Sequence, residues 1–350
     1  MWHSRKVHRR RHQPYARSAY LLGARGPNGR WTIVFNGEIY NCIELREGLQ
    51  AKGHNFATKT GTEVLLTAWA EWGENCLHRF DGMFALFVHG VKDGSLTCVR
   101  DPFEIKPFYY SQDHCKGFAF ASETPALLEL LDQTPRLNRN RAYRFLRWGE
   151  VNDCDGTFYT GVLQLEPGHM SRLSLFNPAK IAVKLWWHPS IEEDNSLSFD
   201  QVADKLRDLF LQNVKRQLRS DVPLPAALSA GVDSSEIVSE IRHLEPDMPI
   251  HTFSYVARGT QVDEEKWCCI GESHAGTVAH YTDYPVSELC SDLDTSVAAQ
   301  EEPIAGMSYA AQCCVFQLAK SKAITVMLDR QGADELLAGY FGYPTLAFSR

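Results

Sequence analysis

The sequence predicts two domains of different fold class: a layered α+β domain, then an α/β domain with a doubly wound parallel sheet. Up to about residue 189, short strand patterns cluster and the helical patterns stand apart from them. A polar segment at residues 194–198 then interrupts the chain. Beyond it, strand and helix patterns alternate, which is typical of a parallel sheet covered by helices. We therefore expect domains at residues 1–190 and 191–350.

Apolar spacing predicts the elements of the first domain. The expected strands, rich in β-branched and aromatic residues, span residues 31–35, 83–88, 96–99 and 118–121. Amphipathic spacing predicts helices at 42–52 and 62–72, and Gly53 ends the first of them. Strands with segregated helices build the layers of an α+β domain.

Strands and helices are expected to alternate in the second domain. The expected strands span residues 225–228, 250–256 and 323–328, the last as a buried parallel strand. A long amphipathic helix is expected at 199–218, with an apolar face formed by Val202, Leu206, Leu209, Phe210 and Val214. The helix after the first strand presents Ile237, Val238, Ile241 and Leu244 on one face.

Composition bounds the classes of function. With 350 residues, 44% of them hydrophobic, the chain has enough apolar material for two cores. Its net charge of −7 gives no general reason to bind nucleic acid or an anionic membrane, and no apolar run reaches membrane-span length. The ten cysteines are scattered without a Cys-x-x-Cys pair, which is typical of reduced thiols and indicates a cytoplasmic protein. The basic run at residues 4–12 is interpreted as a solvated N-terminus.

The most informative segment is a turn of small residues between an apolar strand and a helix, Leu-Ser-Ala-Gly-Val-Asp-Ser-Ser at 228–235. Small residues let the backbone approach an oxyanion closely, and the following helix directs N–H groups and the positive end of its dipole there. Serine hydroxyls add donors, and Asp233 can hold a cation that neutralises phosphates. The segment predicts a phosphate cradle formed by Leu228, Ser229, Ala230, Gly231, Val232, Asp233, Ser234 and Ser235.

A second turn, at residues 329–340, follows the expected strand at 323–328 and carries Asp334 and Glu335 after Gly332. An acidic pair in such a turn is placed for ligand binding, because open α/β sheets bind ligands beyond the carboxyl ends of their strands. Both turns can therefore face one crevice if their strands lie in one sheet.

Together the two turns resemble the ATP-pyrophosphatase synthetase domain of the glutamine-dependent asparagine synthetases, and the likeness covers residues 31–345. The segment at 250–255 resembles the family strand that borders the adenine pocket, which implies nucleotide contacts for Phe253 and Ser254. Other similar segments are the acidic turn at 262–265 and the segment at 301–303 before the long helix. Signatures of the family's class II glutaminase domain are matched at residues 34–41, 100–110 and 120–123.

The resemblance implies an αββα sandwich of the N-terminal nucleophile hydrolase kind, followed by an ATP-binding synthetase domain. It implies that aspartate attacks the α-phosphorus of ATP, that pyrophosphate leaves, and that ammonia, free or from glutamine, displaces AMP to give asparagine. ATP and Mg²⁺ are the implied cofactors, small molecules are the implied partners, and a homodimer is left open. The implied catalytic residues are Asp233, Asp334 and Gln331, with Asp233 and Asp334 as Mg²⁺ ligands.

Three departures from the family pattern bear on the synthetase activity. Ala230 replaces a cradle Gly, and a Cβ is tolerated there only if the backbone does not need a positive φ. Gln331 stands where asparagine-forming relatives carry Glu, so that position loses its charge. The sequence also stops at Arg350, before the family's C-terminal helical region. We therefore expect an incomplete acceptor site.

The glutaminase half is expected to be inactive, with vestigial glutamine-binding positions at Asn36, Gly37 and Glu38. The family needs a Cys directly after the initiator Met, and residue 2 is Trp. Gly61 stands where the family has an Asp that binds the α-amine of glutamine. Glu104 replaces a Gly in the signature at 100–110, so its side chain must fit where relatives have only backbone.

Two rival interpretations stay open. A related ligase can keep the adenylating half and use an internal or peptide amine, as β-lactam synthetases and lasso-peptide cyclases do. A catalytically silent nucleotide-binding homologue is the third possibility. The carboxylate that supports pyrophosphate exchange separates the first two, and tight ATP binding without exchange would select the third.

Overall fold

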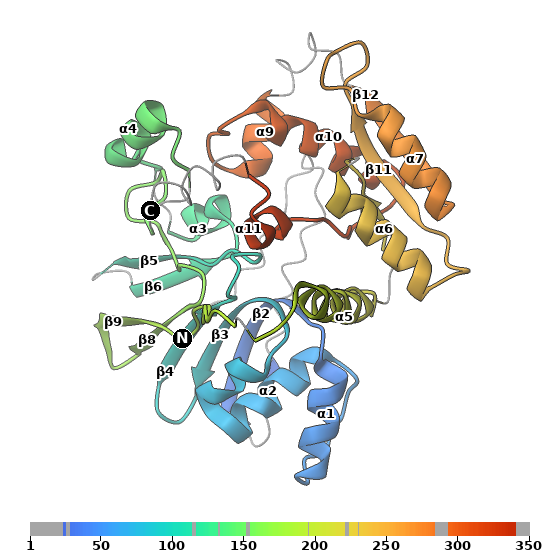
Figure 1. Ribbon diagram of the computed structural model, residues 1–350. Coiled ribbons are helices and arrows are strands. Elements are labelled where there is room, and N and C mark those ends of the chain that lie inside the picture. The colour runs from blue at the N-terminus through green and yellow to red at the C-terminus, as the bar shows by residue number, and fades with distance from the viewer. Residues whose placement is uncertain are drawn as a thin grey trace.

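The computed structural model describes residues 24–25, 29–113, 117–131, 134–151, 155–194, 196–220, 224–229, 231–283 and 293–340. Two bodies of secondary structure follow each other along the chain, an antiparallel part (residues 29–187) and a parallel part (residues 199–340). Figure 1 shows helix α5 (Phe199–Gln217) lying between them. The mixed α/β architecture, with antiparallel sheets first and a parallel sheet second, was predicted correctly.

A six-stranded antiparallel sheet forms the centre of the antiparallel part. Its strands, in spatial order, are β1 (Ala24–Arg25), β2 (Trp31–Ile39), β3 (Gly82–Gly90), β4 (Ser95–Arg100), β8 (His169–Ser174) and β9 (Asn177–Leu185). One face is covered by α1 (Cys42–Ala51), α2 (Gly61–Trp72) and the 3₁₀ helix η2 (Gly73–Arg79). Alternate β3 residues such as Phe84 and Leu86 pack on these helices, as the period of two in a strand requires.

A smaller antiparallel sheet packs on the opposite face of the six-stranded sheet. Its order is β6 (Gly117–Ala121), β5 (Tyr109–Asp113) and β7 (Leu163–Gln164). Phe87 of β3 stacks on Phe120 of β6, with ring centroids 4.4 Å apart, in the core between the two sheets. Helix α3 (Thr124–Leu131) covers the outer face of this second sheet, and α4 (Arg139–Trp148) follows it.

The parallel part is a short sheet with helices on both faces. Its strands are β10 (Ala226–Ala227), β11 (His251–Val256) and β12 (Val278–Asp283). On one face lie α5, α6 (Val232–Leu244) and α7 (Glu265–Ala275), and on the other lies α10 (Met307–Ser321). Helices α9 (Leu293–Gln300) and α11 (Ala333–Leu337) complete the described elements.

The predicted buried strand at 323–328 is wrong for most of its length. Only Leu328 pairs in parallel, with Ala226, while Ala323 has a φ of +61° and Val326 is exposed. The physical reason is the neighbour: β10 has two residues, so it offers a ladder of hydrogen bonds to only the end of this segment. The bridge still brings the turn after Leu328 next to the turn after β10.

Helix α5 starts as its sequence predicts, because Ser198 and Gln201 form a reciprocal capping box. Its predicted apolar face, however, is covered only near the C-terminal end. Val214 is buried, whereas Leu206 is 48% exposed and Leu209 64% exposed. None of the described helices is both long and apolar enough to cross a membrane.

Polar contacts join the two parts on two sides. Arg216, in α5, contacts Asp81 at 2.5 Å, and Arg219 makes a two-pronged contact with Glu44 of α1 at 2.7 and 2.8 Å. On the other side, Glu301 Oε2 accepts hydrogen bonds from the backbone N–H (2.7 Å) and the hydroxyl (3.1 Å) of Thr124. The relative position of the two parts is therefore fixed by charged and polar groups.

Candidate functional site

The turn that follows β10 is held by hydrogen bonds among its own residues. Leu228 is buried and donates its backbone N–H to Phe253, which extends the sheet by one bond. The Ser234 hydroxyl, 1% exposed, accepts from the Ser229 backbone N–H (3.3 Å) and donates to the Gly231 carbonyl (3.2 Å). Ser234 therefore shapes the loop from inside, and Ser229 Oγ lies 3.3 Å from its hydroxyl.

Helix α6 begins directly at this turn, with Gly231 as its N-cap in an extended conformation (φ −70°, ψ 160°). No side chain caps the first turn, so the N–H groups there and the positive end of the helix dipole face the loop. Val232 is 82% exposed, and Ser235 Oγ faces Gly271 of α7 instead of the loop mouth. Ala230 lies outside the described residues.

Arg330 brings the two predicted acidic residues together. Its Nη1 lies 3.1 Å from Asp233 Oδ2, in α6, and 3.5 Å from Asp334 Oδ2, in α11. The same nitrogen lies 3.5 Å from the point that a Cβ on Gly231 would occupy. The guanidinium thus sits over the cradle, and the two turns do face one site as the sequence predicted. Arg330 itself was not predicted.

The other residues of the second turn point elsewhere. Glu335 accepts a hydrogen bond from the Tyr340 hydroxyl at 2.8 Å, and this bond holds the pKa of the Glu335 carboxyl below its usual value. Gly339 leaves room for the Asp334 carboxylate, because a Cβ there would collide with it. Gln331 is exposed and forms no hydrogen bond within the described part of the chain, so its catalytic role stays a prediction.

Strand β11 presents its two predicted nucleotide contacts in different ways. The Phe253 ring is buried on the α10 side and stacks on His280 with centroids 4.7 Å apart, so it belongs to the core. The Ser254 hydroxyl is buried on the other side and has no hydrogen-bond partner among the residues described. The strand is linked to the cradle through the Phe253 carbonyl, which accepts a hydrogen bond from the Leu228 N–H at 3.0 Å.

The predicted glutamine-binding strand is built by close backbone packing. Gly37 has a φ of +153° and pairs with Phe84 across β2 and β3, and a Cβ on Gly37 would lie 2.7 Å from the Phe84 Cα. The Asn36 side chain donates to Ser122 Oγ at 3.1 Å, which fixes the amide next to Gly37. Glu38 is exposed. The position of Gly37 therefore excludes every side chain.

The helix entry beside this strand is held by Glu63. Its carboxylate accepts from the backbone N–H groups of Ala57 (2.8 Å) and Thr58 (2.7 Å), and Thr60 caps α2. A Cβ on Gly61 would lie 4.0 Å from its nearest neighbour, the Cβ of Cys42. Gly61 therefore leaves open space beside Cys42. Burial, and then the nearby Glu38 carboxylate, raise the pKa of the Cys42 thiol.

The Arg-Asp signature at residues 100–106 organises a turn. Asp101, fully buried, accepts from the backbone N–H groups of Phe103, Ile105 and Lys106 at 2.9, 3.1 and 2.9 Å. Glu104 adopts a φ of +63°, in the left-handed region that favours Gly, and its carboxylate contacts Arg100 at 3.3 Å. The turn accommodates the side chain because it points to this arginine.

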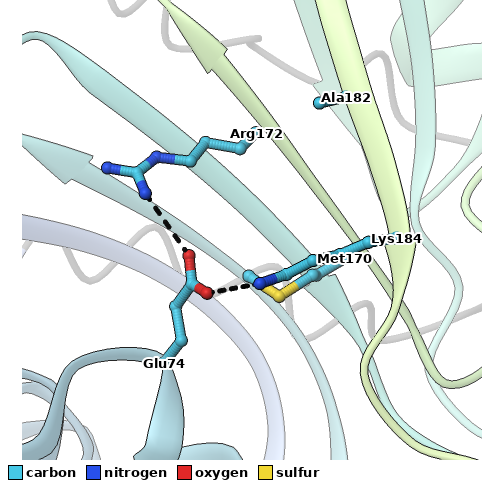
Figure 2. Close-up of a pocket in the computed structure, with 5 residues that line it drawn as sticks. All are labelled: Glu74, Met170, Arg172, Ala182 and Lys184. Carbon is cyan, nitrogen blue, oxygen red and sulfur yellow. Dashed lines mark hydrogen bonds and ion pairs between the residues drawn. The ribbon is translucent and has the colours of Figure 1, made fainter.

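The predicted role of Asp233 and Asp334 as Mg²⁺ ligands stays a prediction. Asp233 and Asp334 are both paired with Arg330, and the described ranges contain no group of three or more His, Cys, Asp or Glu side chains able to hold an ion. A shallow pocket lies elsewhere, between η2 and strands β8 and β9 (Figure 2). There the Glu74 carboxylate is shared between two cations, Lys184 at 2.6 Å and Arg172 at 3.6 Å.

Fold and site together define a two-part chain, in which an antiparallel part precedes a parallel part whose two turns meet at Arg330. Residues 24–187 match the family model of a glutamine amidotransferase domain, and residues 205–350 match that of asparagine synthase. The two models match in succession and together cover most of the chain, which is therefore similar in both parts to the glutamine-hydrolyzing asparagine synthetases.

Two relatives from Bacillus subtilis (strain 168) illustrate the match. Its glutamine-hydrolyzing asparagine synthetase 3 is 31% identical over 325 residues, covering 89% of this chain and 52% of the relative. Its asparagine synthetase 1 is 32% identical over 311 residues, covering 88% and 47%. The chain thus spans about half the length of these curated relatives. Among solved structures, a B. subtilis glutamine PRPP amidotransferase aligns with 13% identity over 88% of this chain and 72% of that one, at a TM-score of 0.35.

Proposed function

We propose that the chain is an ATP-dependent amide-forming ligase that adenylates aspartate and transfers ammonia to it. The observation that carries this proposal is the cradle: a loop of small residues at the N-terminus of α6, closed from inside by Ser234 and covered by Arg330. Such a loop offers N–H donors, a helix dipole and a guanidinium to one polyphosphate. ATP is the nucleotide that the family match supports.

The reaction balances without a redox partner. An oxygen of the aspartate β-carboxylate attacks the α-phosphorus of ATP, the bond to the β-phosphate oxygen breaks, and pyrophosphate leaves with the electron pair. The nitrogen of ammonia then attacks the acyl carbon, AMP leaves, and a proton is released to solvent. The cradle contributes by orienting the phosphates and stabilising the leaving pyrophosphate, which is positional and electrostatic catalysis. We expect Mg²⁺ only as the counter-ion that ATP brings with it.

We propose domain limits of 1–190 and 191–350, an N-terminal nucleophile hydrolase-like sandwich for the first domain, and a cytoplasmic location. We also propose that the first domain does not hydrolyse glutamine. Gly61 offers no carboxylate for the α-amine of glutamine, and the pKa of the Cys42 thiol is raised instead of lowered. Ammonia would then enter from solution.

One observation favours the alternative ligase that uses an internal amine. Gln331 is neutral and exposed at a position where relatives that form asparagine carry Glu, so an ammonium ion finds no carboxylate there. A substrate with its own amine does not need that contact. A substrate other than aspartate that supports AMP formation without ammonia would select this alternative.

The test is product identity. The full chain is incubated with ATP, Mg²⁺, aspartate and ammonium, and AMP, ADP and asparagine are measured. We expect AMP and asparagine in equal amounts and no asparagine when glutamine replaces ammonium. Formation of ADP, or AMP that does not depend on aspartate, would contradict the proposal. Asp233→Ala serves as the control for a contaminating ligase.

A further inference from the structure

The Arg330 side chain has more hydrogen-bond donors than its contacts with described residues use. A guanidinium carries five N–H groups in a planar fork. Within the described residues, the side-chain contacts of Arg330 use Nη1 alone, on Asp233 and Asp334. Arg258 is a useful contrast, because its Nε, Nη1 and Nη2 all contact Glu265 or Asp283. No described residue contacts the Nε and Nη2 groups of Arg330, and the side chain is 34% exposed, so both groups can donate to an anion.

The charge at this point also depends on Arg330. Asp233 and Asp334 bring two negative charges next to a loop that is proposed to receive phosphates, and Arg330 cancels one of them. Without the guanidinium the two carboxylates would repel a phosphate more strongly. No third acidic or histidine ligand completes a metal site among the residues described. The carboxylates therefore have a structural partner in the arginine.

We propose that Arg330 is a phosphate-binding residue of the cradle, and that Asp233 and Asp334 are positioning residues that hold its guanidinium over Gly231 instead of ligands of a protein-held divalent cation. This role rests on the proposed function, since phosphates reach Arg330 only if residues 228–235 bind a nucleotide. Two contacts to one nitrogen hold the guanidinium in place and do not use Nε and Nη2, which can donate to a phosphate.

The opposite view makes a clear alternative: Arg330 would be a stand-in that blocks a cation site and must leave before the nucleotide binds. The two views predict effects of opposite sign. Removing a phosphate ligand weakens the binding of a phosphate compound. Removing a blocking group strengthens it and also frees two carboxylates for a cation.

The first experiment measures binding of the magnesium–pyrophosphate complex to the full chain by titration calorimetry. We expect Arg330→Gln to weaken binding roughly 10- to 100-fold, the range for a lost charge-assisted contact. Arg330→Lys keeps the charge without the fork, and its affinity should lie between the two. Arg207→Gln, an exposed arginine of α5, changes the net charge equally and should bind as the wild type does.

The second experiment uses Mn²⁺ alone as a paramagnetic probe of a protein-held cation. We expect wild type and Asp233→Asn to bind Mn²⁺ equally weakly. Tight Mn²⁺ binding that Asp233→Asn removes would overturn the proposal, as would Arg330→Gln binding magnesium–pyrophosphate as well as or better than wild type. If wild type binds neither magnesium–pyrophosphate nor ATP, the cradle itself is wrong and the proposed function fails with it.

Discussion

The candidate sites in the two parts of the molecule are formed by different groups: backbone in one, and charged side chains in the other. In the antiparallel part, the strand predicted to bind glutamine is defined by backbone: Gly37 packs against β3 so closely that no Cβ fits. In the parallel part, the cradle is completed by side chains that come from distant turns, Asp233, Asp334 and Arg330. A site formed by closely packed backbone needs no charge, but a substitution there disrupts the fold. A site completed by charged side chains keeps its fold when those side chains are substituted, and loses ligand binding instead.

The substitution Gly37→Ala tests the difference between the two sites most strongly. The new Cβ must displace the backbone of Phe84 in the centre of the six-stranded sheet, and we expect a loss of about 3 kcal/mol or more of stability. Gly48→Ala is the matched control: it lies in the exposed face of α1 with nothing near a Cβ, and should add about 0.5–1 kcal/mol. Denaturant unfolding of both variants measures the change in the free energy of unfolding, which should have opposite signs for the two. Equal effects would contradict the backbone argument.

The Asp101 turn tests whether charge has any structural role in the antiparallel part. Asp101→Ala leaves three backbone N–H groups without their acceptor in a buried turn, and we expect a loss of about 3 kcal/mol. Thermal unfolding measures it. A loss below about 1 kcal/mol would mean that water replaces the carboxylate easily. The turn would then be held by the contacts of Arg100 with Lys106 and Leu165.

Glu301 and Glu302 test how charged groups act at the contact between the two parts. Glu301→Ala leaves the buried Thr124 N–H without an acceptor, at a cost of about 2 kcal/mol. Its neighbour Glu302 behaves differently, because burial raises the pKa of its carboxyl. Above that pKa the ionised group is held in a buried site, so Glu302→Gln, which keeps an acceptor for Phe158, should not destabilise the chain.

The pH dependence of the Glu302 effect has a defined sign. The folded-state pKa lies above the ordinary value, so the wild type loses stability relative to Glu302→Gln as the pH rises through the folded pKa. Unfolding curves at several pH values measure the difference. A Glu302→Gln variant that is less stable than wild type at neutral pH would contradict the burial argument.

The smallest expected effect belongs to the Arg219 contact. The hydrogen bond from Arg219 lowers the pKa of Glu44 to about 2, but the Glu44 side chain is half exposed, so the pair contributes less than about 1 kcal/mol. Because the folded pKa is depressed, this contribution is present above the ordinary pKa of 4.5 and disappears as the pH falls towards 2. The difference in melting temperature between wild type and Glu44→Gln should follow that window. A difference that grows on acidification would contradict it.

Sequence patterns predicted the elements that depend on neighbouring residues, and they did not predict side-chain contacts between residues far apart in the chain. The antiparallel strands, the start of α5 at Ser198 and the loop before α6 depend on neighbouring residues, and their patterns predicted them. The Arg330 contact joins residues 97 positions apart, and the Glu301 contact joins residues 177 apart. A single basic residue between acidic ones in the second turn was the only signal for Arg330.

The strand predicted at 323–328 failed for a related reason. Its β-branched run predicts strand propensity, but a strand needs a partner of matching length, and β10 supplies two residues. The exposed stripe of α5 is similar: spacing predicted an apolar face at Leu206 and Leu209, and only packing decides whether it is covered.

The measurement that tests the central claim most directly is the exchange of labelled pyrophosphate into ATP, with the full chain and a panel of amino acids. We predict exchange that depends on aspartate, falls about 100-fold in Asp233→Ala and falls roughly tenfold in Ser234→Ala. Asp233→Ala loses the anchor of Arg330, and Ser234→Ala loses one neutral bond inside the loop. Exchange at the wild-type rate in Asp233→Ala, or ATP binding without exchange for any carboxylate, would contradict an adenylating cradle.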